Sequence, residues 1–201
     1  MNRVPELRGE HLRLRELHAG DHEAFARILT HRVLTRYLGI DRMDAEQAHT
    51  AFAQSLAQPH THPRRKYTLA VCAPDDDALV GTMGLLVEEY GSNAMLTSLA
   101  LLPGAPVRGH GHEAGRLLMA YGFGHLRLHR IWAGHRSDHH FMPQVMHAAG
   151  LRPEATLRQL FRTQGCWHDV TTYATVAPEW KSQATPRELA ILDGAAHLDR
   201  V

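Results

Sequence analysis

The sequence has few cysteines, little net charge and no long apolar run. Its 201 residues include two cysteines, Cys72 and Cys166, which are too few for a disulfide framework and form no CxxC metal site. The net charge of +1 provides no strong field to hold nucleic acid or an anionic membrane. No apolar run approaches the roughly 18 residues of a membrane span, and Met1–Glu6 lacks the apolar core of a signal peptide. We therefore expect no nucleic-acid or membrane partner and a reduced, cytoplasmic setting.

Histidine, by contrast, is abundant, with 17 residues. Several are clustered, at His60–His62, His110–His112 and His135–His140. Such clusters often lie on a solvated surface, but imidazole is also a common ligand of transition metals and haem. The spacing matches no zinc signature. We therefore predict no metal ligands and keep a metal or haem site as an alternative.

Hydropathy patterns predict a chain of strands with interspersed helices. Hydrophobic residues make up 44% and charged residues 21% of the chain, as is ordinary for one packed domain. The apolar runs predict six or seven strands. These lie at Leu7–Leu17, Tyr67–Cys72, Leu79–Glu88, Ala94–Leu102, Arg130–Gly134, Leu157–Thr163 and Val170–Val176. The first alternates apolar and charged residues, so we expect it to be half exposed.

Residues at three- and four-residue steps predict helices that begin near Asp21, Asp44, Gly111 and His140. Strands and helices mixed in this way indicate an α/β or α+β domain with a mixed sheet. Pro178 closes that domain, so we expect a domain over residues 1–177 and a tail over 178–201. The tail has one short predicted helix, Pro186–Leu192, which starts with a capping-box pattern.

Residues Gln58–Lys66 are rich in proline and basic residues and predict a loop. Its last three residues, Arg64, Arg65 and Lys66, could meet an acidic partner or simply lie in solvent.

A Gly-x-Gly turn lies between a buried strand and a helix, within Val107–Ala114. The start of a helix leaves several backbone N–H groups unpaired, with the positive end of the helix dipole behind them. Such a site suits a phosphate or pyrophosphate, and Gly109 and Gly111 would let the backbone approach it closely. A Gly-x-Gly alone is a weak signal, because glycines also ease an ordinary turn between strand and helix.

Several motifs follow one another in an order that resembles a known family. They are Leu7–Arg15, Val80–Gly84, Gly109–Ala114 followed by Tyr121 and Phe123, Leu128–Ala133, Ala149–Arg158 and Gly165–Tyr173. Together they resemble the GNAT acyl-CoA N-acyltransferase superfamily, in its RimJ/RimL-like (ribosomal-protein-alanine N-acetyltransferase-like) branch. The resemblance implies an α+β, sandwich-like single domain with a mixed, mostly antiparallel sheet flanked by helices.

The resemblance also implies acetyl-CoA, or another acyl-CoA, as co-substrate. The loop that would bind its pyrophosphate comprises Arg108, Gly109, His110, Gly111 and His112. The end of the preceding strand, with Leu99 and Leu101, would pair with the pantetheine arm. The acceptor would be a primary amine of a small molecule or of a protein N-terminus, attacking the thioester directly. A homodimer is a further implication.

Positions of the acyl-CoA loop and of the polar active-site residues in that branch differ in this chain. The differing residues are Leu96, Pro106, Val107, His139, Met142 and Met146. We predict three catalytic candidates: Ser98 on the strand at the cleft, Glu88 at the end of the preceding strand, and His139, which can act as acid, base or ligand.

Two alternatives remain open because a fold does not determine its chemistry. The chain could catalyse a different, biosynthetic reaction, with histidines assisted by a metal or haem. It could also be a binding module without catalysis. Copurifying ligands, an absorption spectrum and metal analysis would separate these alternatives.

Overall fold

A computed structural model describes residues 3–90, 92–107 and 109–198, without the side chains of residues 195–198. Eight strands form one sheet in the order β1-β2-β3-β4-β5-β6-β8-β7. The strands are β1 Leu7–Arg8, β2 Arg13–Glu16, β3 Lys66–Cys72, β4 Gly81–Val87, β5 Asn93–Leu101, β6 Arg130–Arg136, β7 Arg152–Thr163 and β8 Cys166–Val176. The helices are α1 His22–Thr30, α2 Arg32–Leu38, α3 Ala45–Ala57, α4 Gly111–Gly124, α5 Met142–Ala148, α6 Ala177–Ser182 and α7 Pro186–Leu198, with short 3-10 turns at Ala19–Asp21 and Gln58–His60.

The α+β fold class is confirmed. All strand pairs are antiparallel except β5 with β6. The eighth strand arises because the predicted strand Leu7–Leu17 is broken by a turn, in which the Gly9 N–H donates to the Leu12 carbonyl at 2.8 Å. The helix α2 was not among the predicted helices. None of the described helices is long and apolar enough to cross a membrane.

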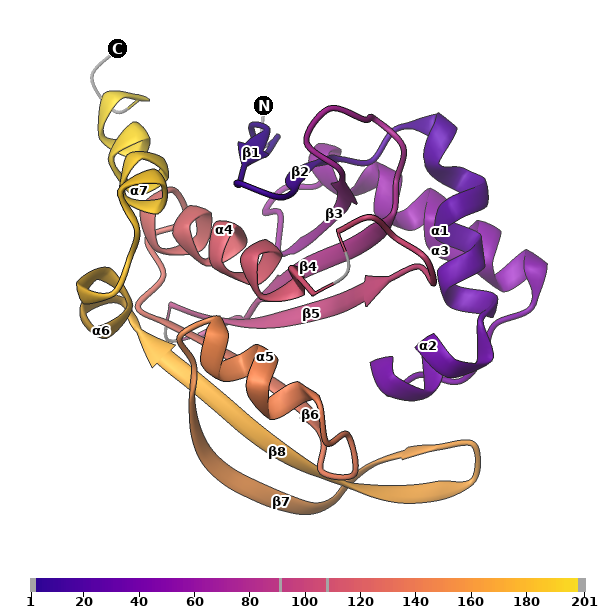
Figure 1. The fold of residues 1–201 in the computed structure, drawn as a ribbon. Coiled ribbons are helices and arrows are strands. Elements are labelled where there is room, and N and C mark those ends of the chain that lie inside the picture. Colours follow the sequence, from indigo (N-terminus) through magenta and orange to yellow (C-terminus); the bar gives the residue numbers. More distant parts are fainter. Residues whose placement is uncertain (1–2, 91, 108, 199–201) are drawn as a thin grey trace.

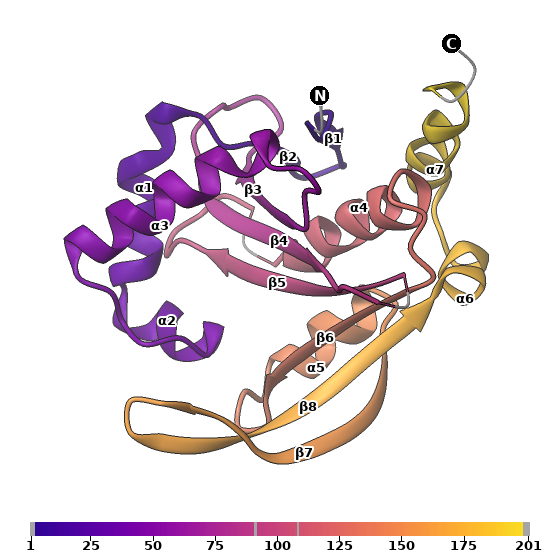
Figure 2. The same cartoon turned by 180° about the vertical axis from the view of Figure 1, so that it is seen from behind.

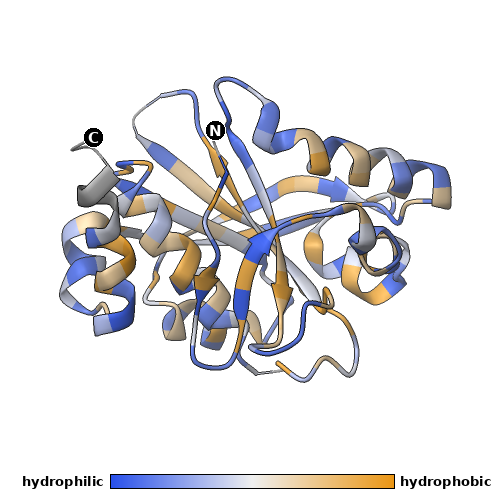
Figure 3. Cartoon of the chain, turned by 90° about the horizontal axis from the view of Figure 1, so that it is seen from above, coloured by the Kyte–Doolittle hydropathy of each residue, from blue (hydrophilic) through white to orange (hydrophobic). Residues whose placement is uncertain are grey.

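Successive side chains along each strand point to opposite faces of the sheet, so the strands form two apolar layers, one on each face. On β3, Tyr67, Leu69 and Val71 face the cluster that contains α4. Ala70 and Cys72, at the alternate positions, face the cluster formed with α1 and α3. Figures 1 and 2 show these helices on opposite faces of β3–β5. In Figure 3, hydrophobic colouring is concentrated where the helices meet the sheet.

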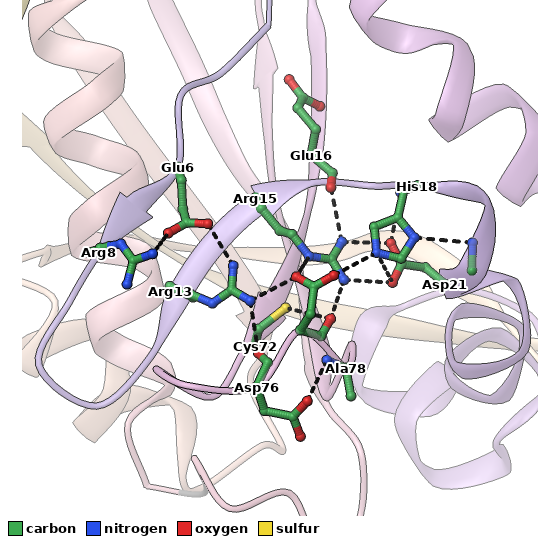
Figure 4. Close-up of polar contacts among 12 residues, drawn as sticks. Glu6, Arg8, Arg13, Arg15, Glu16, His18, Asp21, Cys72, Asp76 and Ala78 are labelled. Atoms are coloured by element: carbon green, nitrogen blue, oxygen red, sulfur yellow. Dashed lines mark hydrogen bonds and ion pairs between the residues drawn. The ribbon is translucent and has the colours of Figure 1, made fainter.

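The predicted half-exposure of the first strand is wrong for its β2 part, because both arginines of β2 are buried. Arg13 and Arg15 on β2 are 8% and 9% exposed. Both guanidinium groups donate to Asp77 Oδ1, each at 2.8 Å, and Arg15 also forms two 2.8 Å hydrogen bonds with the buried Asp21 (Figure 4). Asp77, the partner that both arginines share, comes from a turn some sixty residues away in the chain, so the alternating pattern could not reveal it.

Residues beyond Pro178 pack closely on the sheet domain. The predicted helix start at Pro186 is confirmed, but α7 continues to Leu198 and a further helix, α6, precedes it. Trp180 of α6 is fully buried against Phe123 of α4, with ring centroids 5.5 Å apart. Glu188 of α7 accepts two 2.6 Å hydrogen bonds from Arg116 of α4. This segment therefore covers the outer side of α4 (Figure 1).

A substitution at Gly124 tests the packing of α7 against α4. A Cβ at this position would lie 2.9 Å from the Leu192 Cα atom. We expect Gly124→Ala to lower the free energy of unfolding, although alanine normally favours a helix over glycine by about 1 kcal/mol. At Gly194 of α7 no atom lies within 4 Å of a new Cβ, so Gly194→Ala should raise the free energy of unfolding. Urea denaturation of both variants measures the signs, and stabilisation by Gly124→Ala would contradict the close α4–α7 contact.

Asp77 tests the buried arginine network. Hydrogen bonds from Arg13 and His18 hold the pKa of Asp77 well below its usual range. A lowered folded-state pKa stabilises the fold at neutral pH, and this stabilisation is lost as the pH falls below the ordinary aspartate range. We expect Asp77→Asn to cost about 1 kcal/mol near pH 7, with the variant and the wild type converging in acid. Asp75→Asn in the same turn is the control, and denaturation curves from pH 3 to 7 provide the measurement.

Candidate active site

The parallel strands β5 and β6 separate soon after they meet. They pair at three positions, Asn93–Arg130, Ala94–Ile131 and Met95–Trp132. Beyond Met95 the strands diverge, as Figures 1 and 2 show. A cavity of about 200 Å³ lies in this opening, lined by residues of β5, β6, α2, α4 and α5. We call it the β5–β6 cavity.

A bulge in β5 lies beside this cavity. The register of β4 with β5 shifts between Thr82 and Gly84, whose partners are Ala100 and Thr97. Ser98 falls in the shift with a φ of 59°, a left-handed conformation that costs a non-glycine residue free energy. Its carbonyl accepts a 2.8 Å hydrogen bond from the Thr82 hydroxyl. The bulge leaves the Ser98 side chain exposed at the cavity wall.

Histidines supply much of the polar lining of the β5–β6 cavity. His139 lies against Tyr37 of α2, with ring centroids 4.0 Å apart. Burial, and secondarily the neighbouring His135, lower the pKa of His139 below the usual histidine value. At neutral pH its imidazole is therefore uncharged and able to take up a proton.

His135 was not among the predicted site residues. It is 6% exposed, and its Nδ1 lies 2.7 Å from the Arg136 carbonyl oxygen. Because a carbonyl only accepts, Nδ1 carries a proton and donates this hydrogen bond. Nε2 has no hydrogen-bond partner among the described residues, and the residue lines the same cavity as His139.

The helix α5 contributes only apolar side chains to the cavity, from Met142, Val145 and Met146. Met146 is one of the positions at which this chain differs from the resembled branch. Among the described lining residues, proton transfer in the β5–β6 cavity therefore falls to histidines and hydroxyls.

The structure does not bring the predicted candidate Glu88 to this cavity. Glu88 lies at the β4–β5 turn, and its carboxylate accepts a 2.5 Å hydrogen bond from the Trp132 indole of β6. Neither Glu88 nor Glu89 is among the described residues that line the β5–β6 cavity. Ser98 and His139, in contrast, line the same cavity.

The glycine turn leads into α4 as predicted. Gly109 has a φ of 94°, and Gly111 is the first residue of α4. His110 occupies the cap position without a side-chain cap hydrogen bond, because its ring stacks on His11 at 3.9 Å. The first amides of α4 thus receive no side-chain cap from His110, which leaves them open to an anion. Arg108 lies outside the described residues.

Next to this turn, His11, His110 and Glu113 place their ligand atoms within 4.8 Å of one another. The two rings are nearly parallel, with an interplanar angle of 14°. Imidazole nitrogens bind a metal in the plane of the ring, so parallel stacked rings direct their lone pairs along separate planes and not toward one ion.

Leu99 and Leu101 direct their side chains toward the α4 core. Their methyl carbons lie 3.6 to 3.9 Å from the Cβ position built on Gly111. Only the main chain of these residues is therefore left to pair with a ligand. Since β5 pairs with β6 only up to Met95 among the described residues, the main chain beyond that point can accept an additional extended segment.

A second cavity, of about 740 Å³, lies on the opposite face of the sheet. It is bounded by α1, α3 and strands β3 to β5, and we call it the α1–α3 cavity. Four residues line both cavities: Leu38, Met95, Thr97 and Ser98. The two cavities therefore meet at the β5 bulge, where a ligand from each face could come into contact.

Comparisons with known proteins agree with this geometry. A family model described as an acetyltransferase (GNAT) domain matches residues 11–152. The chain is 25% identical over 174 residues to YoaA of Bacillus subtilis (strain 168), described as an uncharacterised N-acetyltransferase, covering 87% of this chain and 98% of YoaA. A GNAT-family structure from Chromobacterium violaceum has a TM-score of 0.73 at 22% identity, covering 89% of this chain and 90% of that one. A spermidine N-acetyltransferase from Vibrio cholerae, in complex with CoA and spermine, has a TM-score of 0.73 at 18% identity, covering 86% and 99%.

Proposed function

The chain belongs to the GNAT acetyltransferase family, and on that premise we propose that this N-acetyltransferase moves the acyl group of an acyl-CoA directly onto a primary amine. The observation that carries the proposal is the meeting of the two cavities at Ser98. The β5–β6 cavity would hold the thioester end of the acyl-CoA, and the α1–α3 cavity would hold the amine. Direct transfer then depends mainly on holding the two reactants in position.

The described residues fit an acyl-CoA at its pyrophosphate and along its pantetheine arm. The first amides of α4, at Gly111 and His112, would hold the pyrophosphate, together with the loop residues Gly109 and His110. The main chain of β5 at Leu99 and Leu101 would pair with the amide groups of the pantetheine arm. Arg108 remains part of this prediction from the sequence alone.

We assign proton transfer to His139. Its neutral imidazole takes the proton that the amine loses as the new C–N bond forms. The C–S bond then breaks, and the resulting imidazolium returns the proton to the CoA thiolate, so that an amide and free CoA are the products. Ser98, at the cavity junction, would position the thioester or a water molecule. Acid–base catalysis of this kind contributes about 10² to 10⁴-fold in rate.

The finer identity of the reaction stays a prediction. It comprises the RimJ/RimL-like branch, acetyl-CoA as the particular acyl donor, a small-molecule amine or protein N-terminus as acceptor, a homodimer and a cytoplasmic location. The spermidine enzyme from Vibrio cholerae supports a small-molecule amine as one class to test.

Calorimetry with acetyl-CoA, followed by CoA release with a panel of amines and peptide N-termini, tests the proposal. We expect acetyl-CoA to bind, free CoA to appear only with an amine, and no acetylated enzyme to form in mass spectra. No heat at millimolar acetyl-CoA would overturn the proposal. Binding without turnover would favour a binding module, and a coloured or metal-containing protein would favour the alternative chemistry.

A pair of variants tests the assignment of His139. We expect His139→Gln to lower kcat about 100-fold with little change in the KM of acetyl-CoA. His140→Gln is the matched control, because His140 is exposed and lies outside the cavity lining. The lowered pKa of His139 predicts that wild-type kcat is lost only as the pH falls below the usual histidine range. An acid limb of the pH profile that persists in His139→Gln would show that another group is the base.

A further inference from the structure

We propose that the α1–α3 cavity accepts an amine with an apolar body and an anionic far end, and selects against polyamines. This inference rests on the proposed function, since it names the acceptor class of that same site. It comes from the distribution of charge in the cavity lining. The charged side chains among the described lining residues are Arg65 and Lys66, both cationic.

The two cationic side chains differ in whether a carboxylate already balances their charge. Arg65 lies 3.5 Å from the Glu89 carboxylate, so part of its charge is already balanced. For Lys66, no ion pair is present within the part of the chain that the structure describes. Its ammonium is therefore the cation available to an incoming anion.

The sheet register places Lys66 on the cavity floor. Lys66 of β3 lies opposite Leu86 of β4, which lies opposite Met95 of β5, and all three line the cavity. Two strand spacings of about 4.8 Å separate β3 from β5. The anionic end would thus lie roughly 10 Å across the floor from Met95. The bulge, where the amine must meet the thioester, begins two residues further along β5 at Thr97, so the two ends of the ligand would lie roughly 12 to 14 Å apart.

The intervening surface is mostly apolar. The cavity walls include Phe25, Ile28 and Leu29 of α1, and Leu86 and Met95 lie on the floor. Such a surface suits a hydrocarbon body. A second ammonium group with no carboxylate partner would be costly to desolvate there.

The nearest grouped carboxylates lie outside this cavity, in an adjoining hollow at the start of α3. Asp41, Asp44 and Glu46 line that hollow together with Arg42. Asp44 already accepts a 2.8 Å hydrogen bond from the backbone N–H of Gln47. Asp41 accepts one of 2.8 Å from the backbone N–H of Gln164. A polyamine that extended into this hollow would be the competing occupant, and the experiment below distinguishes it.

Three probes with the same number of carbon atoms, eight, test the proposal: 8-aminooctanoate, 1-aminooctane and 1,8-diaminooctane. Their far ends are anionic, apolar and cationic. With acetyl-CoA as donor, we expect kcat/KM to fall in that order, by about tenfold or more between the first and the last. Calorimetric binding of the same probes in the presence of CoA should follow the same order, whether or not transfer occurs.

Variants of Lys66 test whether this side chain causes the order of preference among the three probes. Lys66→Met should bring 8-aminooctanoate down to the level of 1-aminooctane, and Lys66→Glu should reverse the order of the acid and the diamine. Lys181→Glu, on the exposed face of α6, carries the same charge change and should leave the order as in the wild type.

The outcomes separate the two proposals. A wild-type preference for the diamine in binding and turnover, an unchanged order in Lys66→Glu, or the absence of probe binding would overturn the inference. The expected order in binding without any transfer would support the inference and overturn the proposed acyl transfer.

Discussion

The short parallel contact between β5 and β6 is the constraint on which the rest of the structure depends. Three residue pairs join the strands. At the joined end, the His129 amide donates to the Ser92 carbonyl at 2.8 Å, and the Trp132 indole donates to Glu88. Among the described residues no further pair joins them, and the strands separate beyond Met95 (Figures 1 and 2). Glu88 thus helps to hold the closed end of the cleft.

That separation explains how two faces of one sheet can share a reaction centre. A continuous β-sheet isolates the ligands on its two sides. Here the edge of β5 is open beyond Met95, and the bulge at Ser98 interrupts its pairing with β4. The cavities on the α4 and α1–α3 faces consequently meet at one short segment of main chain.

Local patterns predicted most of the strands, because the side chains that define them alternate between two apolar layers. The prediction was wrong at Arg13 and Arg15, whose burial depends on acidic partners that come from elsewhere in the chain. The length of α7 also exceeded the prediction. Its stability comes in part from Arg116 and Gly124 of α4, which no local pattern can show.

The candidate site was predictable to a similar degree. Ser98 lies on the apolar strand before the glycine turn, and His139 was singled out by the resemblance to the family; both line the same cavity. His135 was missed because the predicted strand ended at Gly134. The alternation of the buried Ile131 and Ala133 continues to position 135, and this is the signal that could have found it. Tyr37 lies on α2, and its contact with His139 is purely tertiary.

The covering of α4 by α6 and α7 also has a consequence during synthesis. Every strand of the sheet precedes these helices in the chain, and domains generally begin to fold from the N-terminal side as they emerge from the ribosome. The completed sheet must therefore carry α4 with an uncovered apolar flank until Trp180 and the residues after it arrive. In that interval, after the cleft has formed and before the outer layer closes, this flank is open to chaperones and to aggregation.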